Sequence, residues 1–266
     1  MRKHSNVSEA VVEAVAQQLR FAALHRVPCP AVRDVLNADD IAIAYAVQKR
    51  IIAGRVAEGA RVVGRKVGLT SPAVQEQLGV EQPDFGVLLD CMAYTEVDRL
   101  LQPKIEAEVG FVLAEDLVSG ELSYRQVRDA VAYAVATLEI VDSRIEGWDI
   151  TYVDTVADNA SSGLFVVGDE RRSLDEFSPV AAQMEMSIDD EVVSSGNGAA
   201  CLGDPINALR WLAVTAREFG EPLLGGQIVL SGALGPMAPI NGPCTVRACI
   251  SGLGSVAATF TDGKTV

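Results

Sequence analysis

Apolar and polar residues alternate over residues 104–113, and this period of two predicts a strand. Glu106 and Glu108 take polar positions in this alternation. Side chains two residues apart on a strand point to the same face, so the Cα atoms of the two glutamates are expected roughly 7 Å apart on one face. Two like charges this close repel each other unless a cation or a proton lies between them. The pattern leaves two interpretations open: a solvent-exposed polar face and part of a metal site.

Helical spacing of apolar residues predicts two helices in the first 60 residues, over residues 8–27 and from residues 39–40 onward. A Ser-x-x-Gln capping box predicts a third helix over residues 123–136. An Asp-Pro start and a closing Gly predict a fourth over residues 204–220. We therefore expect a helical N-terminal region of residues 1–60.

Short apolar segments bounded by glycine or turn residues predict further strands at residues 61–70, 138–141, 163–168, 184–188, 191–194, 228–231, 246–250 and 256–261. The dipeptide at residues 189–190 joins two of them as a hairpin. Strands separated by irregular loops favour an α+β fold over an alternating βαβ series. We expect residues 61–266 to form a second, β-rich domain.

Composition narrows the functional classes. The 266 residues are 49% hydrophobic, enough for a sizeable core, and carry a net charge of −14. This acidity argues against partners such as nucleic acid or an anionic membrane surface, because basic patches supply most of the affinity for either. We find no signal peptide and no apolar run of about 20 residues that could span a membrane.

Cysteine and histidine usage narrows the chemistry further. The five cysteines are scattered without a Cys-x-x-Cys, which is typical of thiols in a reducing cytoplasm. The two histidines, His4 and His25, both precede every candidate segment. A histidine-held zinc site or a Ser-His-Asp triad is therefore improbable, and a metal here would be held by oxygen ligands, as Mg²⁺ or Mn²⁺ is.

Other charged residues interrupt apolar segments. Glu139 lies within the predicted strand 138–141, where a carboxylate is exposed, or paired if buried. Together with Glu106 and Glu108 it would suit a hard divalent cation that keeps positions open for water and substrate. Lys66 precedes a glycine turn and is either a solvent-facing lysine or a group that meets an anionic substrate.

Three more segments have both an ordinary and a functional interpretation. Residues 83–86, Pro-Asp-Phe-Gly, are typical of a turn. Residues 154–163 form a small, hydroxyl-rich stretch that is either a plain loop or the lining of a pocket. Residues 231–237 either turn a corner or let the backbone approach a ligand closely.

Taken in order, these segments resemble the 2-keto-4-pentenoate (2-hydroxypentadienoate) hydratases. That family forms part of the hydratase/decarboxylase branch of the fumarylacetoacetate hydrolase superfamily. The resemblance extends from about residue 40 to the C-terminus and is carried by residues 64–70, 82–86, 104–108, 138–144, 154–163 and 231–237. It implies a mixed β-sheet roll with a helical N-terminal region, so that residues 61–266 become the catalytic domain.

The resemblance also assigns roles to residues. The family's Glu-x-Glu strand and a later glutamate hold one Mg²⁺ or Mn²⁺, and the matching residues are Glu106, Glu108 and Glu139. The lysine and aspartate of the first two motifs lie at the substrate, and here they are Lys66 and Asp84.

Two further stretches would help to bind the carboxylate end of the substrate. They are the turn that contains Leu69 and Thr70 and the segment that contains Ser161 and Ser162. The implied substrate is a small 2-keto acid, with a homo-oligomeric assembly in the cytoplasm and association with a pathway decarboxylase or aldolase as a further expectation.

The implied reaction is metal-dependent hydration of 2-hydroxypenta-2,4-dienoate to 4-hydroxy-2-oxopentanoate, in the degradation of aromatic compounds. The main alternative is a 2-oxo-3-hexenedioate (4-oxalocrotonate) decarboxylase of the same branch. A C–C hydrolase is a weaker alternative, since some of those use a His/Glu pair and both histidines here lie upstream of the motifs. A non-catalytic partner subunit is weaker still, because every expected site residue is present.

Overall fold

The computed structural model describes residues 9–36, 41–71, 75–76, 80–93 and 100–261. The helices in these ranges include α1 (Glu9–His25), α2 (Arg33–Leu36), α3 (Ile41–Ala57), α5 (Tyr124–Asp129), α6 (Tyr152–Ala157) and α7 (Pro205–Glu218). The strands are β1 (Val62–Gly68), β2 (Asp84–Leu89), β3 (Lys104–Leu113), β4 (Val131–Val141), β5 (Ser162–Val167), β6 (Gln183–Ile188), β7 (Glu191–Asn197), β8 (Ile228–Ala233), β9 (Ala238–Pro239), β10 (Cys244–Ile250) and β11 (Gly254–Phe260).

Two sheets form the body of the molecule. The larger has the order β2-β1-β8-β3-β4-β5, with β9 paired to β3, and the smaller has the order β11-β10-β6-β7. The β1–β8 pair is parallel and the other pairs are antiparallel, so the larger sheet is mixed. This confirms the predicted α+β fold with a mixed sheet.

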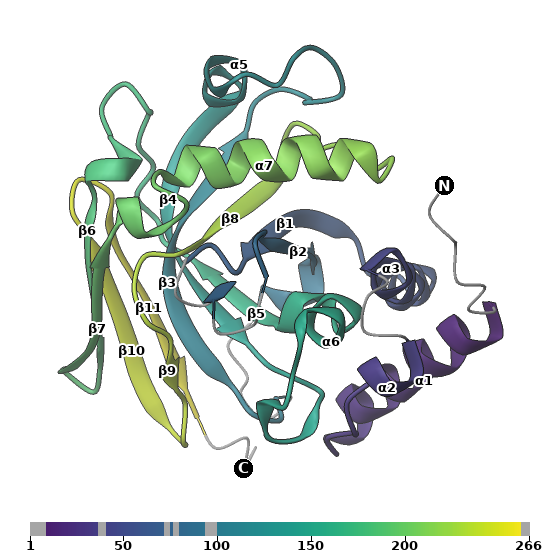
Figure 1. Cartoon of the computed structure of the whole chain (residues 1–266). Coiled ribbons are helices and arrows are strands. Elements are labelled where there is room, and N and C mark those ends of the chain that lie inside the picture. Colours follow the sequence, from purple (N-terminus) through teal and green to yellow (C-terminus); the bar gives the residue numbers. More distant parts are fainter. Residues whose placement is uncertain (1–8, 37–40, 72–74, 77–79, 94–99, 262–266) are drawn as a thin grey trace.

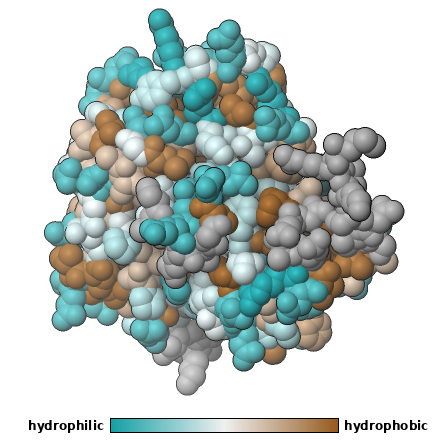
Figure 2. Space-filling model, in the orientation of Figure 1, coloured by the Kyte–Doolittle hydropathy of each residue, from teal (hydrophilic) through white to brown (hydrophobic). Residues whose placement is uncertain are grey.

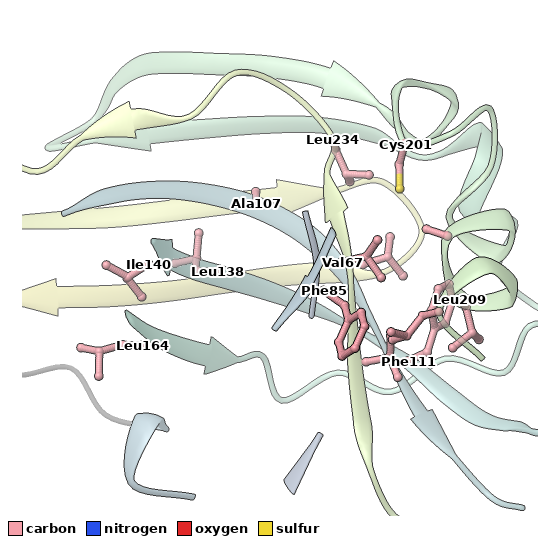
Figure 3. Packing of buried hydrophobic residues seen from close by; sticks show 14 of the residues in the cluster. Val67, Phe85, Ala107, Phe111, Leu138, Ile140, Leu164, Cys201, Leu209 and Leu234 are labelled. Atoms are coloured by element: carbon pink, nitrogen blue, oxygen red, sulfur yellow. The ribbon is translucent and has the colours of Figure 1, made fainter. Parts of the chain in front are cut away.

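Helices flank the larger sheet on different sides. In Figure 1, α7 crosses over β8, whereas α3 and α6 lie together beside β2, and α1 packs on α3. The smaller sheet packs against β4 through β10 and β11. Figure 3 shows Val67, Phe85, Phe111 and Leu209, which belong to the apolar core that joins the larger sheet to α7. The central strands are therefore covered on both faces.

Strand β3 shows why the alternation of residues 104–113 was ambiguous. Almost every residue of this strand is buried, on both faces, because β4 and β8 pair with its edges and other elements cover it. The interpretation of Glu106 and Glu108 as a solvent-exposed face is therefore wrong. Their face points into the molecule.

A side-chain amide closes the gap between the two edges of the larger sheet. The sheet curls so that its edge strands β2 and β5 approach each other, and the turn Asn159–Ser161 lies between them. Asn159 receives the backbone N–H of Val87 on Oδ1 at 2.8 Å and donates from Nδ2 to the carbonyl of the same residue at 2.9 Å. The amide thus occupies the place that a neighbouring strand would take. We call this junction the Asn159 seam.

Several local predictions are confirmed. The helix predicted over residues 204–220 is α7, with the Asp204 carboxylate accepting the N–H of Ile206 at 2.9 Å. The predicted hairpin is β6–β7, and the strands predicted at residues 163–168 and in the C-terminal part are present. The N-terminal helices are α1 and α3, although their predicted first residues lie outside the described ranges.

The structure corrects three other predictions. The helix over residues 123–136 has the predicted cap, since Ser123 accepts from the N–H of Gln126, but α5 ends at Asp129. The apolar residues that follow join β4, because pairing with β3 buries them. The predicted turn at residues 83–86 is instead the start of β2, which pairs with β1. The predicted loop 154–163 contains the end of α6 and the turn Asn159–Ser161.

The N-terminal helices pack directly on the β-rich part. Gln48 on α3 is buried and donates from Nε2 to the carbonyls of Phe85 and Val156 at 2.9 and 3.1 Å. The division into domains at residues 60 and 61 stays a prediction. Among the described residues, no helix combines the length and the apolar character needed to cross a membrane.

Asp154 anchors the segment before α2 to α6, and its loss is expected to destabilise the fold. The buried carboxylate accepts from the backbone of Val32 and Arg33, from the Arg33 side chain, and from Thr151, at 2.8–2.9 Å. Burial alone would raise its pKa, but the bonds from Arg33 and Thr151 outweigh burial and lower it below 3.8. Asp154→Asn is expected to reduce the free energy of unfolding by about 3 kcal/mol at pH 7, because a buried pair loses one partner.

The pH dependence of this effect follows from the lowered pKa. Asp154 stabilises the protein above the ordinary carboxyl pKa, and this contribution is lost as the pH falls through the lower pKa of the folded state. Denaturant unfolding at several pH values should therefore show the difference between wild type and variant shrinking in acid. Asp149→Asn is the control, because this exposed partner of Arg33 should contribute less than about 1 kcal/mol.

Candidate metal centre and active site

Three buried carboxylates meet at the centre of the larger sheet. Glu106 and Glu108 come from β3 and Glu139 from the adjacent strand β4, where it is the register partner of Glu106. One oxygen of each lies within 4.8 Å of the others. The exposed fractions are 7%, 0% and 0%. The register of β3 and β4 therefore brings together the three residues that the motifs assigned to a metal.

Protein donors leave much of this cluster unsatisfied. The backbone N–H of Gly232 donates to Oε2 of Glu108 at 2.8 Å. Within the part of the chain that the structure describes, Oε1 of Glu108 and Oε2 of Glu139 have no hydrogen-bond partner. Burial raises the pKa of Glu106 to about 7, and the negative charge of Glu139 adds to this rise. Burial also raises the pKa of Glu108, and the negative charges of Glu139 and Glu106 raise it further. Buried carboxylates without donors are costly unless a cation or a proton lies between them.

The chemical type of the ligand atoms decides which cation fits the cluster. Three carboxylates are hard oxygen ligands, which suit Mg²⁺ or Mn²⁺, and they leave positions for water or a substrate. The unpartnered oxygens of Glu108 and Glu139 are available as ligands. The cluster therefore fits the expected divalent metal.

Lys66 lies beside the cluster as a buried positive charge. Its Nζ is 3.2 Å from Oε1 of Glu139, and the residue is 3% exposed. Burial favours a lower pKa, but the negative charges of Glu139, Asp84 and the two β3 glutamates outweigh burial and raise the pKa of Lys66. The side chain therefore stays an ammonium, and the interpretation as a solvent-facing lysine is wrong.

Asp84, on β2, lies on the same side of the sheet as Lys66 and close to its ammonium. It is the register partner of Gly68, and a Cβ on Gly68 would lie 2.2 Å from Oδ1 of Asp84 and 3.3 Å from Nζ of Lys66. Glycine at this position thus leaves room for the carboxylate and the ammonium to approach each other. Burial raises the pKa of Asp84, and Lys66 opposes that rise.

The expected substrate-binding residues surround this group. Leu69 has a left-handed backbone, with φ 57°, and Thr70 is buried against Gly232. Ser161 is buried, with its Oγ 3.2 Å from Oγ1 of Thr155. The hydroxyl of Ser162 donates to the carbonyl of its own turn at residue 159, at 2.7 Å. Binding of a substrate carboxylate by these residues stays a prediction.

Sequence reasoning missed two residues at the site. Thr155 links Ser161 to Asp84, donating to Oδ2 of Asp84 at 3.4 Å, and the thiol of Cys201 donates to the carbonyl of Ser231 at 2.9 Å. Thr155 lies inside the segment 154–163 that the motifs marked, so its position in that segment was the available signal. No spacing pattern pointed to Cys201.

A substitution at Gly232 tests whether a backbone N–H helps to position a carboxylate of the metal cluster. Its φ is +109°, and a Cβ would lie 2.4 Å from Oγ1 of Thr70, while its N–H holds Glu108. Gly232→Ala is expected to displace this N–H and weaken Mn²⁺ binding by roughly 10- to 100-fold, as loss of a partner that orients a ligand does. Calorimetric titration with Mn²⁺ measures the effect.

A matched glycine separates backbone strain from the steric clash. Gly226 also has a positive φ, +83°, but a Cβ there would meet no atom of the described residues within 4 Å. Gly226→Ala should therefore lower stability slightly without altering Mn²⁺ affinity. Equal Mn²⁺ affinity in both variants would contradict the role of the Gly232 N–H.

Comparison with known proteins identifies the family. The family model for the C-terminal region of fumarylacetoacetate (FAA) hydrolase matches residues 71–261. The chain belongs to the fumarylacetoacetate hydrolase family. This confirms the resemblance found in the motifs, and the matched region contains Asp84 and all three clustered glutamates.

Individual members of the fumarylacetoacetate hydrolase family match over almost the whole chain. A 2-keto-4-pentenoate hydratase of Burkholderia vietnamiensis is 48% identical over 256 residues, covering 94% of this chain and 98% of the relative. A 2-keto-4-pentenoate hydratase 2 of Dechloromonas aromatica is 50% identical over 253 residues, covering 93% and 97%.

A solved structure of the family matches the fold closely. The 4-oxalocrotonate decarboxylase from Pseudomonas putida G7, complexed with magnesium and adipate, superposes with a TM-score of 0.91 at 33% identity. The match covers 96% of this chain and 98% of the decarboxylase. The N-terminal helices of this chain thus have counterparts in relatives, although they lie outside the family model.

Proposed function

We propose that the protein is a hydro-lyase of the 2-keto-4-pentenoate hydratase type, which converts 2-hydroxypenta-2,4-dienoate and water to 4-hydroxy-2-oxopentanoate. The observation that carries the proposal is the buried set of Glu106, Glu108 and Glu139 beside Lys66 and Asp84. It occurs in a chain 48% identical to a hydratase of that name over 94% of its length.

The metal-binding role of the three glutamates is part of the proposal. They would hold one Mg²⁺ or Mn²⁺, and a magnesium-bound structure of a relative at 33% identity supports this assignment. Such a cation, when bound, acts as a Lewis acid that polarises a 2-keto acid.

The protein's own groups account for the proton transfers. Hydration first needs the enol to become a ketone, with the enol proton lost and a proton gained at the far carbon, C5. Water then adds its oxygen at C4 and a proton at C3. Lys66 and Asp84 face the same buried space and can give and accept these protons. The fixed positive charge of the Lys66 ammonium also stabilises the negative charge that develops on the substrate during the reaction.

A spectrophotometric assay tests this function. Enzymically generated 2-hydroxypenta-2,4-dienoate absorbs in the ultraviolet through its conjugated system, and this absorbance should fall when enzyme and Mg²⁺ or Mn²⁺ are present together. Chelation of the metal should stop the reaction, and readdition should restore it. Absence of turnover with either metal would refute the proposal.

The second candidate is a decarboxylase acting on 2-oxo-3-hexenedioate. The close superposition with 4-oxalocrotonate decarboxylase favours it, but at 33% identity the match is weaker than those to the hydratases. Both substrates should be offered to the enzyme while CO₂ release is followed. CO₂ release without hydration would assign the decarboxylase instead.

We propose that the protein acts in the cytoplasm as a homo-oligomer. We also propose that it associates with a decarboxylase or an aldolase of the same pathway. Figure 2 shows apolar residues gathered over the edge strand β7, where Val192 and Val193 are 59% and 41% exposed. Exposed apolar residues on a sheet edge are commonly covered by another chain. Light scattering after size-exclusion chromatography measures the assembly, and a monomeric mass would refute it.

A further inference from the structure

Three side-chain oxygens connect the candidate proton-transfer residue to the candidate carboxylate-binding residue. Oδ2 of Asp84 lies 3.4 Å from Oγ1 of Thr155, which in turn lies 3.2 Å from Oγ of Ser161. The three residues are between 1% and 4% exposed. Both distances are long for hydrogen bonds between hydroxyl and carboxyl oxygens, and such contacts often tighten when a substrate binds.

The single hydroxyl proton of Thr155 makes this chain directional. A hydroxyl can donate one hydrogen bond, so Thr155 donates either to Asp84 or to Ser161 but not to both. If Asp84 is ionised, it can only accept, so Thr155 donates to Asp84 and accepts the proton of Ser161. If Asp84 carries a proton, it can donate to Thr155, which then donates to Ser161.

The two arrangements leave Ser161 with opposite properties. In the first, the Ser161 proton is used by Thr155, and Ser161 presents only lone pairs to a ligand. In the second, the Ser161 proton is free to be donated to a carboxylate. A substrate carboxylate accepts hydrogen bonds, and it is therefore matched by the second arrangement only, in which Asp84 is protonated.

We propose that Thr155 is a positioning residue that couples the two ends of this chain, so that binding of a 2-keto acid carboxylate at Ser161 is accompanied by proton uptake at Asp84. The proton comes from solvent, and no covalent bond other than the O–H bond is formed. The inference rests on the proposed function and on the carboxylate-binding role of Ser161. Binding of the substrate would thereby place Asp84 in the acid form that it needs to protonate the substrate.

The backbone around Ser161 fixes the geometry of the chain. Asn159, Ala160 and Ser161 all have positive φ values, between 52° and 55°, which non-glycine residues rarely adopt. The Asn159 seam holds this turn on one side, and the N–H of Asp142 donates to the carbonyl of Ser161 at 2.8 Å on the other. Strained backbone persists only where the surroundings hold it in place, and such sites are commonly functional.

Arg144 adds a third restraint to this turn. Its side chain bonds to the carboxylate and the carbonyl of Asp158, and its Nη1 donates to the carbonyl of Ser162 at 2.8 Å. The direction in which the Ser161 side chain leaves the turn is therefore determined by several bonds.

Other charged and titratable groups also face Asp84, and they must be kept constant in a test. They are Lys66 on β1, Glu106 on β3, Glu139 on β4, Tyr45 on α3 and Tyr152 on α6. None of these is altered by a substitution at Thr155. Because the Thr155 hydrogen bond itself lowers the pKa of Asp84, a change in proton uptake reports on the whole hydroxyl chain only when Ser161→Ala, which keeps that bond, shows it too.

The test uses Thr155→Val, which removes the hydroxyl at nearly constant volume, with Thr155→Ser as the variant that keeps it. Each full-length protein, loaded with Mg²⁺, is titrated with 2-oxopentanoate, a saturated 2-keto acid that cannot be hydrated. Calorimetry in two buffers of different ionisation enthalpy gives the number of protons taken up. For wild type and Thr155→Ser, measured over a series of pH values, we expect proton uptake that rises toward about one proton per site, because binding and protonation are linked.

In Thr155→Val, the expected proton uptake is near zero, and binding of 2-oxopentanoate no longer depends on pH over the same range, because no Thr155 hydroxyl is left to accept the Ser161 proton. Ser161→Ala interrupts the chain at its other end and should also bind without proton uptake, so that the test stands if the valine variant fails to fold. Uptake equal to wild type in either variant, or none in wild type, would overturn the inference and leave the proposed function intact. Failure of the wild type to bind 2-oxopentanoate would count against the proposed function itself.

Discussion

Glu106→Gln is expected to lower kcat/KM for hydration by about a thousand-fold or more, because it removes one of three carboxylates that would hold the metal. The loss should come with weaker binding of Mn²⁺, measured by calorimetry, and should not be fully restored by a high metal concentration. Glu115→Gln is the matched control, since this exposed glutamate follows the same strand and lies outside the cluster. Near-normal turnover in Glu106→Gln would refute the site.

Glu106→Gln is expected to lower activity without lowering the stability of the metal-free protein. Without metal, three buried carboxylates repel each other, and replacing one by a neutral amide relieves part of this repulsion. The metal-free variant should therefore unfold at the same temperature as the wild type or at a higher one. A loss of activity together with a gain of stability cannot result from misfolding.

Lys66→Met is expected to lower kcat by about 10²- to 10⁴-fold, the usual contribution of a positioned proton-transfer group. Methionine keeps most of the length and the apolar stem but removes the ammonium, which lies 3.2 Å from Glu139. Since Asp84 and the three glutamates then lack this buried positive charge, the metal-free protein should also lose about 3–5 kcal/mol of unfolding free energy. Steady-state kinetics and denaturant unfolding measure the two effects.

The control for Lys66 is Lys49→Met. Its ammonium pairs with Glu221, but its side chain is 68% exposed, so the variant should lose less than about 1 kcal/mol and keep its activity. The two site variants are thus expected to move metal-free stability in opposite directions. A Lys66→Met protein as stable and as active as wild type would contradict a charged lysine in the site.

The sequence predicted the local elements of the site better than their arrangement. Alternation identified β3 and placed Glu106 and Glu108 on one face, because a strand period depends only on neighbouring residues. The nearness of Glu139 depends on the register between β3 and β4, which no local pattern specifies. From its own residues, the sequence showed only that Glu139 would suit the same cation as the other two, and the family resemblance assigned all three to one metal.

The errors have a common physical origin. The capping box at Ser123 correctly marked the start of a helix, but its end was misplaced because strand pairing and burial outweighed local propensity beyond Asp129. Thr155 was missed because its contact with Ser161 depends on the left-handed turn at residues 159–161, which the residue types do not predict, and its contact with Asp84 depends on the packing of α6 on β2. In each case, tertiary contacts decided the conformation.

The Asn159 seam has a consequence for folding kinetics. It joins Val87 to a residue 72 positions later, so its two hydrogen bonds require closure of a long loop. Contacts of such large sequence separation form slowly, after hairpins such as β6–β7 have paired. We expect the seam to form late, with amide hydrogens of β2 gaining exchange protection after those of β6 and β7. The hydroxyl chain at Ser161 would then be completed only at the end of folding, so that no folding intermediate presents a finished active site.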